Sequence, residues 1–219
     1  MKTAIVLGAS GLIGGHVLSI LLADNRFGKV ICIGRRPLEI EHEKLEQLTG
    51  DLFEMESFKS AFQESTDLFV AIGTTRAKTP DKTLYEKIDL GIPVAAAKLS
   101  KTCGIKNIAV VSSMGADANS RVFYSSLKGK MEDAFLALSA NNVNIVRPSL
   151  LLGDRNEDRA GESIGAFIMT KLDFLVPEKH KAIEGKTVAQ AMVYLANQPH
   201  EKKIWLNNEL KELARKSVL

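Results

Sequence analysis

Tyr124 and Lys128 are four positions apart in this sequence and form a YxxxK pattern at the expected start of a helix. Residues at i and i+4 share one side of a helix, so the phenol and the ammonium group point into one space. A tyrosine hydroxyl is a weak acid at neutral pH, and a nearby cation favours its deprotonated form. The pattern is compatible with a proton-transfer pair, but by itself it is more typical of a surface pair without function.

Two serines precede this pair in a position that favours the chemical interpretation. Ser112 and Ser113 follow the apolar run 108–111, which is predicted to be a strand. A hydroxyl at the end of that strand can donate to a carbonyl oxygen while Tyr124 delivers its proton. We predict that Ser113 has this catalytic role and that Ser112 satisfies a backbone group.

A glycine-rich segment with the spacing GxxGxxG follows the first apolar run, 3–7, and opens an apolar helical pattern. Glycines at this spacing allow a tight turn, the close approach of a diphosphate and close packing of helix on strand. The start of the helix supplies unpaired N–H groups and the positive end of its dipole. We therefore predict a dinucleotide site formed by Gly8, Ser10, Gly11, Leu12, Ile13 and Gly14.

Two arginines indicate which dinucleotide binds. Arg35 and Arg36 follow the second predicted strand, 30–33. At this position an acidic residue binds the ribose 2′-hydroxyl of NAD(H), whereas an arginine pairs with the 2′-phosphate of NADP(H). The first acid beyond them is Glu39. NADP(H) is therefore the predicted cofactor, ahead of NAD(H). Asp51 and Leu52, after the third predicted strand, either border the adenine or form an ordinary turn.

Short apolar runs alternate with helical patterns along the chain, which predicts an α/β fold of the Rossmann type: a doubly wound parallel sheet with helices on both faces. Strands are expected at 3–7, 30–33, 45–48, 68–72, 108–111 and 143–146. Helices are expected over 12–22, 55–62, 82–102 with a break at Gly91-Ile92-Pro93, 124–139 and 188–196. The chain is predicted to be a single domain, 1–219, with a Rossmann core over 1–150 and a small substrate-covering part over 151–219.

The composition excludes several other classes of protein. A net charge of +3 over 219 residues, spread along the chain, argues against nucleic-acid binding. Cys32, Cys103 and the four histidines lack metal-ligand spacing, so no metal site is expected. No run of 18 apolar residues is present, so no membrane span is expected. The short apolar start, interrupted from Gly8 onward, reads as a strand, and we expect a cytoplasmic protein.

These patterns together resemble the atypical short-chain dehydrogenase/reductase superfamily and, more narrowly, the Tat-interacting tumour-suppressor oxidoreductase family and its bacterial relatives. The resemblance rests on Gly8-Ala9-Ser10-Gly11, Leu68 to Arg76, Ser112-Ser113-Met114-Gly115-Ala116-Asp117, Tyr124 to Lys130 and Arg147 to Arg155. It implies NADP(H) binding by the glycines and both arginines, and catalytic roles for Ser113, Tyr124 and Lys128. Further cofactor contacts are expected from Gly73, Thr74, Thr75, Ser112, Pro148, Ser149 and Leu150.

One position departs from the pattern of the superfamily. Many members carry an asparagine on the helix before the serine strand, where this chain has Asp89. The departure puts an asparagine-held water relay in doubt, but not cofactor binding.

The leading interpretation is an NADP(H)-dependent oxidoreductase that acts on a small carbonyl or alcohol. One alternative is a regulatory sensor of NADP(H) that binds a protein partner, and another is a nucleotide-sugar epimerase or dehydratase. About 65 residues follow the last predicted strand, which is a small substrate region for a sugar nucleotide. Within 153–186, which we expect to cover the active site, four apolar residues either line a pocket or pack as core: Ile164, Phe167, Ile168 and Met169.

Overall fold

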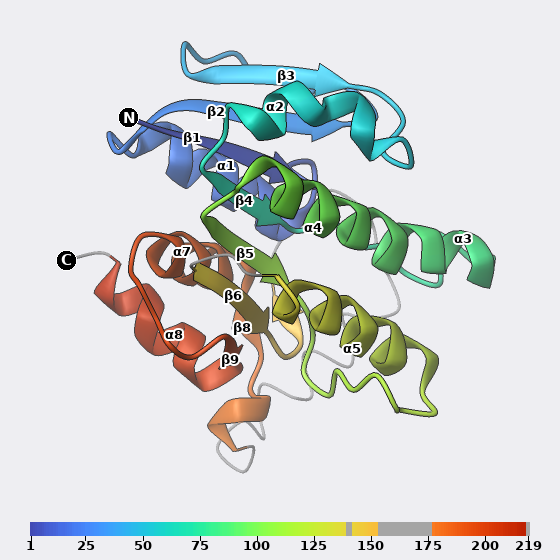
Figure 1. Ribbon diagram of the computed structural model, residues 1–219. Coiled ribbons are helices and arrows are strands. Elements are labelled where there is room, and N and C mark those ends of the chain that lie inside the picture. Colours follow the sequence, from blue (N-terminus) through green and yellow to red (C-terminus); the bar gives the residue numbers. More distant parts are fainter. Residues whose placement is uncertain (139–141, 153–176, 218–219) are drawn as a thin grey trace.

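The computed structural model describes residues 1–138, 142–152 and 177–217, and seven parallel strands lie at the centre of this part of the chain. They are β1 (Lys2–Leu7), β2 (Phe27–Gly34), β3 (Leu45–Thr49), β4 (Asp67–Val70), β5 (Asn107–Val111), β6 (Asn142–Arg147) and β9 (Ile204–Leu206). Their order in the sheet is β3-β2-β1-β4-β5-β6-β9 (Figure 1). The chain thus starts in the middle of the sheet at β1 and continues through β2 to β3 at one edge. It then crosses back to β4 and continues to β9 at the other edge, which confirms the predicted doubly wound fold. Such a sheet has a crevice at the carboxyl ends of β1 and β4, where the winding direction reverses.

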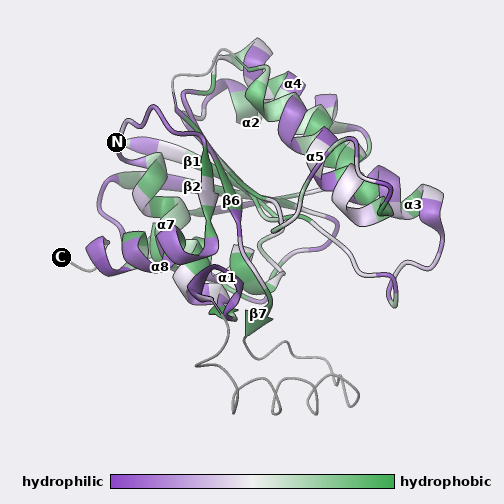
Figure 2. Cartoon of the chain, turned by 90° about the horizontal axis from the view of Figure 1, so that it is seen from below, coloured by the Kyte–Doolittle hydropathy of each residue, from purple (hydrophilic) through white to green (hydrophobic). Residues whose placement is uncertain are grey.

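Helices cover both faces of the sheet (Figure 2). One layer contains α1 (Leu12–Ala23), α7 (Gly185–Ala196) and α8 (Asn207–Lys216), and the other contains α2 (Lys59–Gln63), α4 (Ile92–Cys103) and α5 (Phe123–Leu136). Shorter elements are η1 (Met55–Phe58), α3 (Lys82–Glu86), η2 (Lys87–Gly91), η4 (Glu178–His180) and a small sheet of β7 (Leu151–Leu152) and β8 (Ile183–Glu184).

Strand β1 shows why the apolar runs are continuous rather than alternating. Ala4 and Val6 pack into the core beneath α1 and α7, whereas Ile5 and Leu7 face the core on the opposite side. All four are fully buried. A central parallel strand has no face toward water, so each of its positions is apolar.

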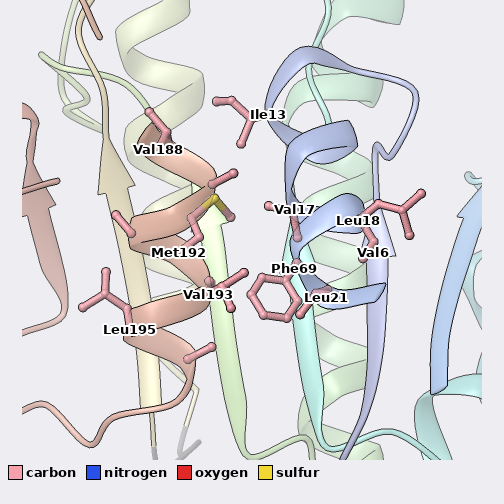
Figure 3. Close-up of a cluster of buried hydrophobic side chains, with 14 of the residues drawn as sticks. Val6, Ile13, Val17, Leu18, Leu21, Phe69, Val188, Met192, Val193 and Leu195 are labelled. Carbon is pink, nitrogen blue, oxygen red and sulfur yellow. The ribbon is translucent and has the colours of Figure 1, made fainter. Parts of the chain in front are cut away.

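Helix α7 belongs to the hydrophobic core that lies between the sheet and α1. Val17 and Leu21 of α1 meet Val188 and Met192 of α7 over Phe69 of β4 (Figure 3). The sequence pattern predicted a helix here, but not β9 or α8, which follow it. The described residues of 177–217 therefore complete both the sheet and the core, and the expected role of 151–219 in covering a substrate stays a prediction.

The helical stretch after β4 does not break where we expected. The chain passes from α3 through one wide π-helical turn, η2, into α4, and Pro93 lies in the first turn of α4. Proline has no N–H to donate, and a widened turn accommodates its ring without ending the helix. The turn also carries Asp89 into the protein interior.

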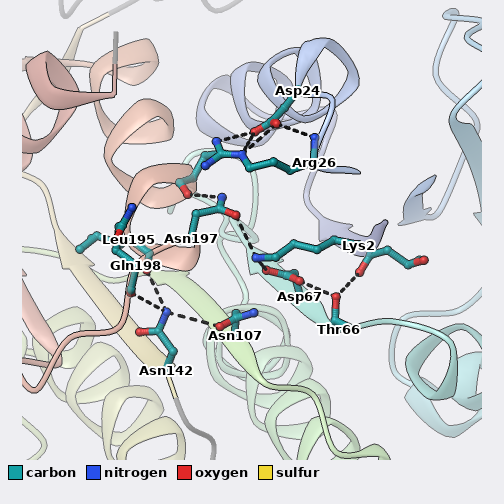
Figure 4. Close-up of polar contacts among 12 residues, drawn as sticks. Lys2, Asp24, Arg26, Thr66, Asp67, Asn107, Asn142, Leu195, Asn197 and Gln198 are labelled. Carbon is teal, nitrogen blue, oxygen red and sulfur yellow. Dashed lines mark hydrogen bonds and ion pairs between the residues drawn. The ribbon is translucent and has the colours of Figure 1, made fainter. Parts of the chain in front are cut away.

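Polar contacts join the amino ends of the strands (Figure 4). The Lys2 ammonium group contacts Asp67 Oδ1 at 3.2 Å and donates to Asn197 Oδ1 at 2.9 Å. Asn142 donates to the backbone oxygen of Leu195 at 2.9 Å. These contacts tie β1, β4 and β6 to the end of α7, on the edge of the sheet opposite the candidate site. No helix among the described residues has the length and apolar character to cross a bilayer.

Candidate active site

The glycine-rich loop follows β1 and lies against the end of β4. Gly8 has a φ of +90°, and a Cβ there would come within 2.6 Å of the Ala71 oxygen. A Cβ on Gly14 would come within 2.1 Å of the Gly8 oxygen, so the first turn of α1 packs directly on the loop. Gly11 is different, because its Cβ would lie 3.3 Å from the Gly8 oxygen. The outer glycines are therefore required by packing, and Gly11 faces outward at the start of the helix.

The start of α1 has no side-chain cap among the described residues. Gly11 is the N-cap, with no side-chain hydrogen bond, and the first turn contains no acidic residue. The Leu12 side chain lies on Gly185 of α7, and Ile13 is buried in the core. These two residues can reach a cofactor only through their backbone N–H groups. Such a helix start fits the diphosphate of a dinucleotide.

Arg35 and Arg36 come directly after β2, beside the glycine loop. Both are exposed, and neither forms an ion pair within the described part of the chain. Asp51 accepts a hydrogen bond from the Phe53 N–H at 2.9 Å, and Leu52 is buried in the core. Asp51 thus forms a turn and Leu52 packs, while their contact with an adenine stays a prediction.

Tyr124 and Lys128 lie on the first turns of α5, as the spacing predicted. The Lys128 ammonium nitrogen lies 5.8 Å from the centre of the Tyr124 ring. Tyr124 is 40% exposed, whereas Lys128 is 3% exposed. The pair therefore combines an accessible hydroxyl with a cation shielded from water.

Asp89 is the partner that makes this burial possible. Its Oδ1 lies 3.2 Å from the Lys128 nitrogen, and its Oδ2 accepts the Thr74 N–H at 2.7 Å. Gly73 leaves room for the pair, since a Cβ there would lie 3.3 Å from Asp89 Oδ1. In the sequence Asp89 was apparent only as a departure from a family pattern, whereas in the structure it joins α5 to the turn after β4.

The turn after β4 is held by its own side chains. Thr74 Oγ1 pairs with Thr79 Oγ1 at 2.8 Å, and the Tyr85 hydroxyl donates to the Thr74 oxygen at 3.3 Å. The Thr75 oxygen accepts the Thr79 N–H at 2.9 Å. Burial, followed by the charge of Asp89, raises the pKa of Tyr85 well above its ordinary value, so its phenol stays neutral. Gly73 and Thr74 thus lie beside the Asp89–Lys128 pair, while the contact of residues 73–75 with a cofactor stays a prediction.

The two serines at the end of β5 have different environments. Ser113 Oγ is buried without a hydrogen-bond partner among the described residues. Ser112 Oγ donates to the carboxylate of Glu132, which corrects our expectation of a backbone partner. The same carboxylate accepts from Arg147 Nε at 2.8 Å, and this hydrogen bond raises the pKa of the guanidinium. Ser112, Glu132 and Arg147 thus hold the ends of β5 and β6 together, while the catalytic role of Ser113 stays a prediction.

The segment 148–150 lies beside the serine turn, where the Pro148 oxygen accepts the Met114 N–H at 3.1 Å. The Ser149 hydroxyl donates to the backbone of Lys181, and its N–H donates to Asn207 Oδ1 at 3.1 Å. Ser149 therefore acts within the chain, and its hydroxyl is already engaged. Asn207, which sequence reasoning missed, is buried and joins this segment to α8. Leu150 is half exposed.

A pocket of about 290 Å³ opens beside Tyr124, between α5 and the segment that follows β4. It is lined by Arg76, Thr79, Pro80, Lys82, Tyr85, Val122, Phe123 and Tyr124. Ile164, Phe167, Ile168 and Met169 lie outside the described residues. Within the described ranges, no cluster of three acidic, histidine or cysteine side chains is arranged to hold a metal.

A doubly wound parallel sheet with a glycine loop at the point where its winding direction reverses defines the class of dinucleotide-binding Rossmann proteins. Comparison with protein families agrees, because the model of the NAD(P)H-binding family matches residues 8–199. The chain belongs to this family. The uncapped helix start and the unpartnered hydroxyl of Ser113 both fit such a cofactor.

Curated relatives include the mitochondrial protein FMP52 of Debaryomyces hansenii, 33% identical over 203 residues that span 90% of this chain and 88% of the relative. Protein HTATIP2 of Rattus norvegicus is 35% identical, over 74% of this chain and 67% of its own length. These relatives confirm the resemblance to the Tat-interacting oxidoreductase family. They also correct our expectation of a cytoplasmic protein, since the similar yeast proteins are mitochondrial by name.

Solved structures share the fold at low sequence identity. MoeE5 in complex with UDP-glucuronic acid and NAD superimposes with a TM-score of 0.71 at 18% identity, over 95% of this chain and 76% of that protein. The UDP-glucose 4-epimerase of Thermotoga maritima, with UDP-glucose, gives 0.69 at 16% identity, over 98% and 82%. At this distance the likeness establishes the Rossmann fold alone.

Proposed function

We propose that this protein is an NADP(H)-dependent oxidoreductase that interconverts a small carbonyl compound and its alcohol. The observation that carries the proposal is the tyrosine–lysine pair at the start of α5, which packs against the loop that follows the serines. Tyr124 offers an accessible hydroxyl, Lys128 lies buried behind it, and Ser113 has a buried hydroxyl without a described partner. A sensor that only binds a dinucleotide has no need of this trio.

In a carbonyl reduction, each of the three side chains has a separate role. The bound cofactor supplies a hydride, so a C–H bond forms at the carbonyl carbon. Tyr124 gives its hydroxyl proton to the carbonyl oxygen, and Ser113 donates a hydrogen bond to the same oxygen. Lys128, held by Asp89, supports the phenol and the cofactor ribose. One carbonyl, one NADPH and one proton from solvent are consumed for each alcohol and NADP⁺ formed, and the reverse reaction oxidises the alcohol with NADP⁺.

Removal of the Tyr124 hydroxyl tests this function directly. Tyr124→Phe keeps the ring, so the Kd for NADPH is expected to stay within about twofold while turnover falls about 10²-fold or more, the scale of a positioned acid–base group. A screen of aldehydes, ketones and quinones with NADPH supplies the assay. Tyr194→Phe removes a hydroxyl from α7 and serves as the matched control. A rate indifferent to Tyr124→Phe would exclude the mechanism, and tight NADPH binding without any accepted carbonyl would favour a regulatory sensor.

The preference for NADP(H) is part of the same proposal and rests on Arg35 and Arg36. We expect NADPH to bind at least about tenfold more tightly than NADH, since a forked pairing of arginine with a 2′-phosphate is worth about 1.4 kcal/mol or more. Calorimetric titration of both cofactors measures the ratio. Arg35→Ala is expected to lower it, and Arg215→Ala on α8 is the control. Equal affinities in the unaltered protein would rule out the preference.

A further inference from the structure

The pocket beside Tyr124 has an apolar, partly exposed wall. The rings of Tyr85 and Phe123 meet edge to face, with their centres 5.8 Å apart. Val122 is 62% exposed and Phe123 is 38% exposed, which is unusual for large apolar side chains on one short segment. Such a surface favours a flat, apolar ligand that covers it.

The same pocket carries positive charge that the described chain does not neutralise. Arg76 and Lys82 both line it, and neither forms an ion pair with a described residue. The Lys82 nitrogen lies 5.9 Å from the centre of the Phe123 ring. No acidic side chain is among the described lining residues. An anionic group on the ligand would therefore meet two cations at the rim.

Two acidic residues near these cations in sequence, Asp81 and Asp89, have other contacts. Asp81 accepts the N–H groups of Thr83 and Leu84, at 2.7 and 3.1 Å, and so caps α3. Asp89 pairs with Lys128. Glu86, four residues after Lys82, is exposed and does not line the pocket, and no described carboxylate pairs with Arg76 or Lys82.

We propose that this pocket selects the substrate: a carbonyl compound with a single flat ring and a carboxylate on the far side of the ring from the carbonyl. This proposal rests on the oxidoreductase function proposed above. The carbonyl meets Tyr124, the ring lies against Phe123 and Val122, and the carboxylate reaches Arg76 and Lys82. A volume of about 290 Å³ is at the lower end of the range for ligand pockets and suits one ring.

A pair of aldehydes that differ only in charge tests the turnover. With NADPH, kcat/KM for 4-carboxybenzaldehyde is expected to exceed that for methyl 4-formylbenzoate by at least tenfold. Arg76→Gln and Lys82→Gln are each expected to lower this ratio, and the double variant to bring it within twofold of one. Lys98→Gln on α4 and Arg215→Gln on α8 remove cations outside the pocket and are expected to keep the ratio. A ratio near one in the unaltered protein would overturn the proposal.

A binding measurement separates this proposal from the oxidoreductase function. We expect 4-carbamoylbenzoate, which is not reducible here, to bind at least tenfold more tightly than its methyl ester in calorimetry, in the unaltered protein and in Tyr124→Phe. Selective binding without turnover of either aldehyde would support the pocket and reject the oxidoreductase. Equal binding of acid and ester would reject the pocket. If Arg76→Gln instead weakens NADPH binding tenfold and leaves the acid-to-ester ratio unchanged, Arg76 belongs to the cofactor site and the proposal fails.

Discussion

A buried ammonium group beside an accessible phenol is the main electrostatic feature of the site. Burying a charge is unfavourable unless a partner and hydrogen bonds compensate for the lost water. Lys128 obtains this compensation from Asp89, whose second oxygen is occupied by the Thr74 N–H. Both side chains are almost fully buried. Asp89 therefore acts on the reaction through Lys128, as a positioning residue.

Removal of the Asp89 carboxylate should be strongly destabilising. Asp89→Ala leaves Lys128 as an uncompensated buried charge, so we expect the free energy of unfolding to fall by about 3–5 kcal/mol. Asp89→Asn keeps an acceptor for Thr74 and should lose less. Denaturant titration measures both.

Asp81→Ala is the matched comparison, because Asp81 is exposed and only caps α3. Loss of such a cap is expected to cost about 1 kcal/mol. If Asp89→Ala costs no more than Asp81→Ala, the buried ion pair does not stabilise the fold as we infer.

Close packing of helices on loops positions the site at the level of its elements. A Cβ on Gly129, in the middle of α5, would come within 2.0 Å of the Ala118 nitrogen. Glycine inside a helix is unfavourable by about 1 kcal/mol relative to alanine, yet here no other residue fits. The contact brings α5, with Tyr124 and Lys128, against the loop that follows the serines.

The glycine loop allows binding and folding to be separated. Gly11→Val is expected to keep the fold and abolish NADPH binding, because the side chain would occupy space that the diphosphate needs. Gly14→Ala is expected to lower the free energy of unfolding by about 1–3 kcal/mol or more, since its Cβ would overlap the Gly8 oxygen. Circular dichroism and NADPH fluorescence on the same samples measure both effects. A folded Gly11→Val that retains affinity would show that this loop does not hold the diphosphate.

In the whole molecule the residues of the candidate site lie at the carboxyl ends of the strands. The hydrophobic residues are enclosed between the sheet and its two helix layers. Cys32 illustrates this enclosure. It lies in the core beneath α1, and burial raises the pKa of its thiol to about 12. At pH 8 only about one part in ten thousand is the reactive thiolate. Burial also raises the pKa of Cys103, but that residue is partly exposed on α4.

The two thiols should therefore report on opening of the whole fold. We expect iodoacetamide at pH 8 to alkylate Cys103 first, and Cys32 only as fast as the core opens. Raising the pH should increase the rate at Cys103 first, since its thiol is the more accessible. Peptide mass spectrometry gives both rates, and urea below the unfolding midpoint should accelerate Cys32. Equal rates in the native protein would contradict the buried position of Cys32.

Local spacing was enough to predict the fold class and to name the candidate residues of the site. The strands that contain Ala4 to Leu7 and Ile108 to Val111 could be predicted because parallel strands buried on both faces are apolar throughout. The glycine spacing after β1 and the YxxxK spacing on α5 could be recognised in the sequence because each motif is formed by residues a few positions apart. All of these signals concern residues that are neighbours in sequence.

Contacts between segments that are distant in the sequence could not be predicted from local spacing. Asp89 meets Lys128 because the π turn and α5 pack together, and the Ser149 hydroxyl is engaged because Lys181 lies beside it. Strand β9 has three residues and exists only because β6 offers an edge for it to pair with. The sequence thus specified which groups the protein carries. The packing of the sheet and helices specified which of them are paired, buried or exposed, because burial and pairing depend on neighbours far away along the chain.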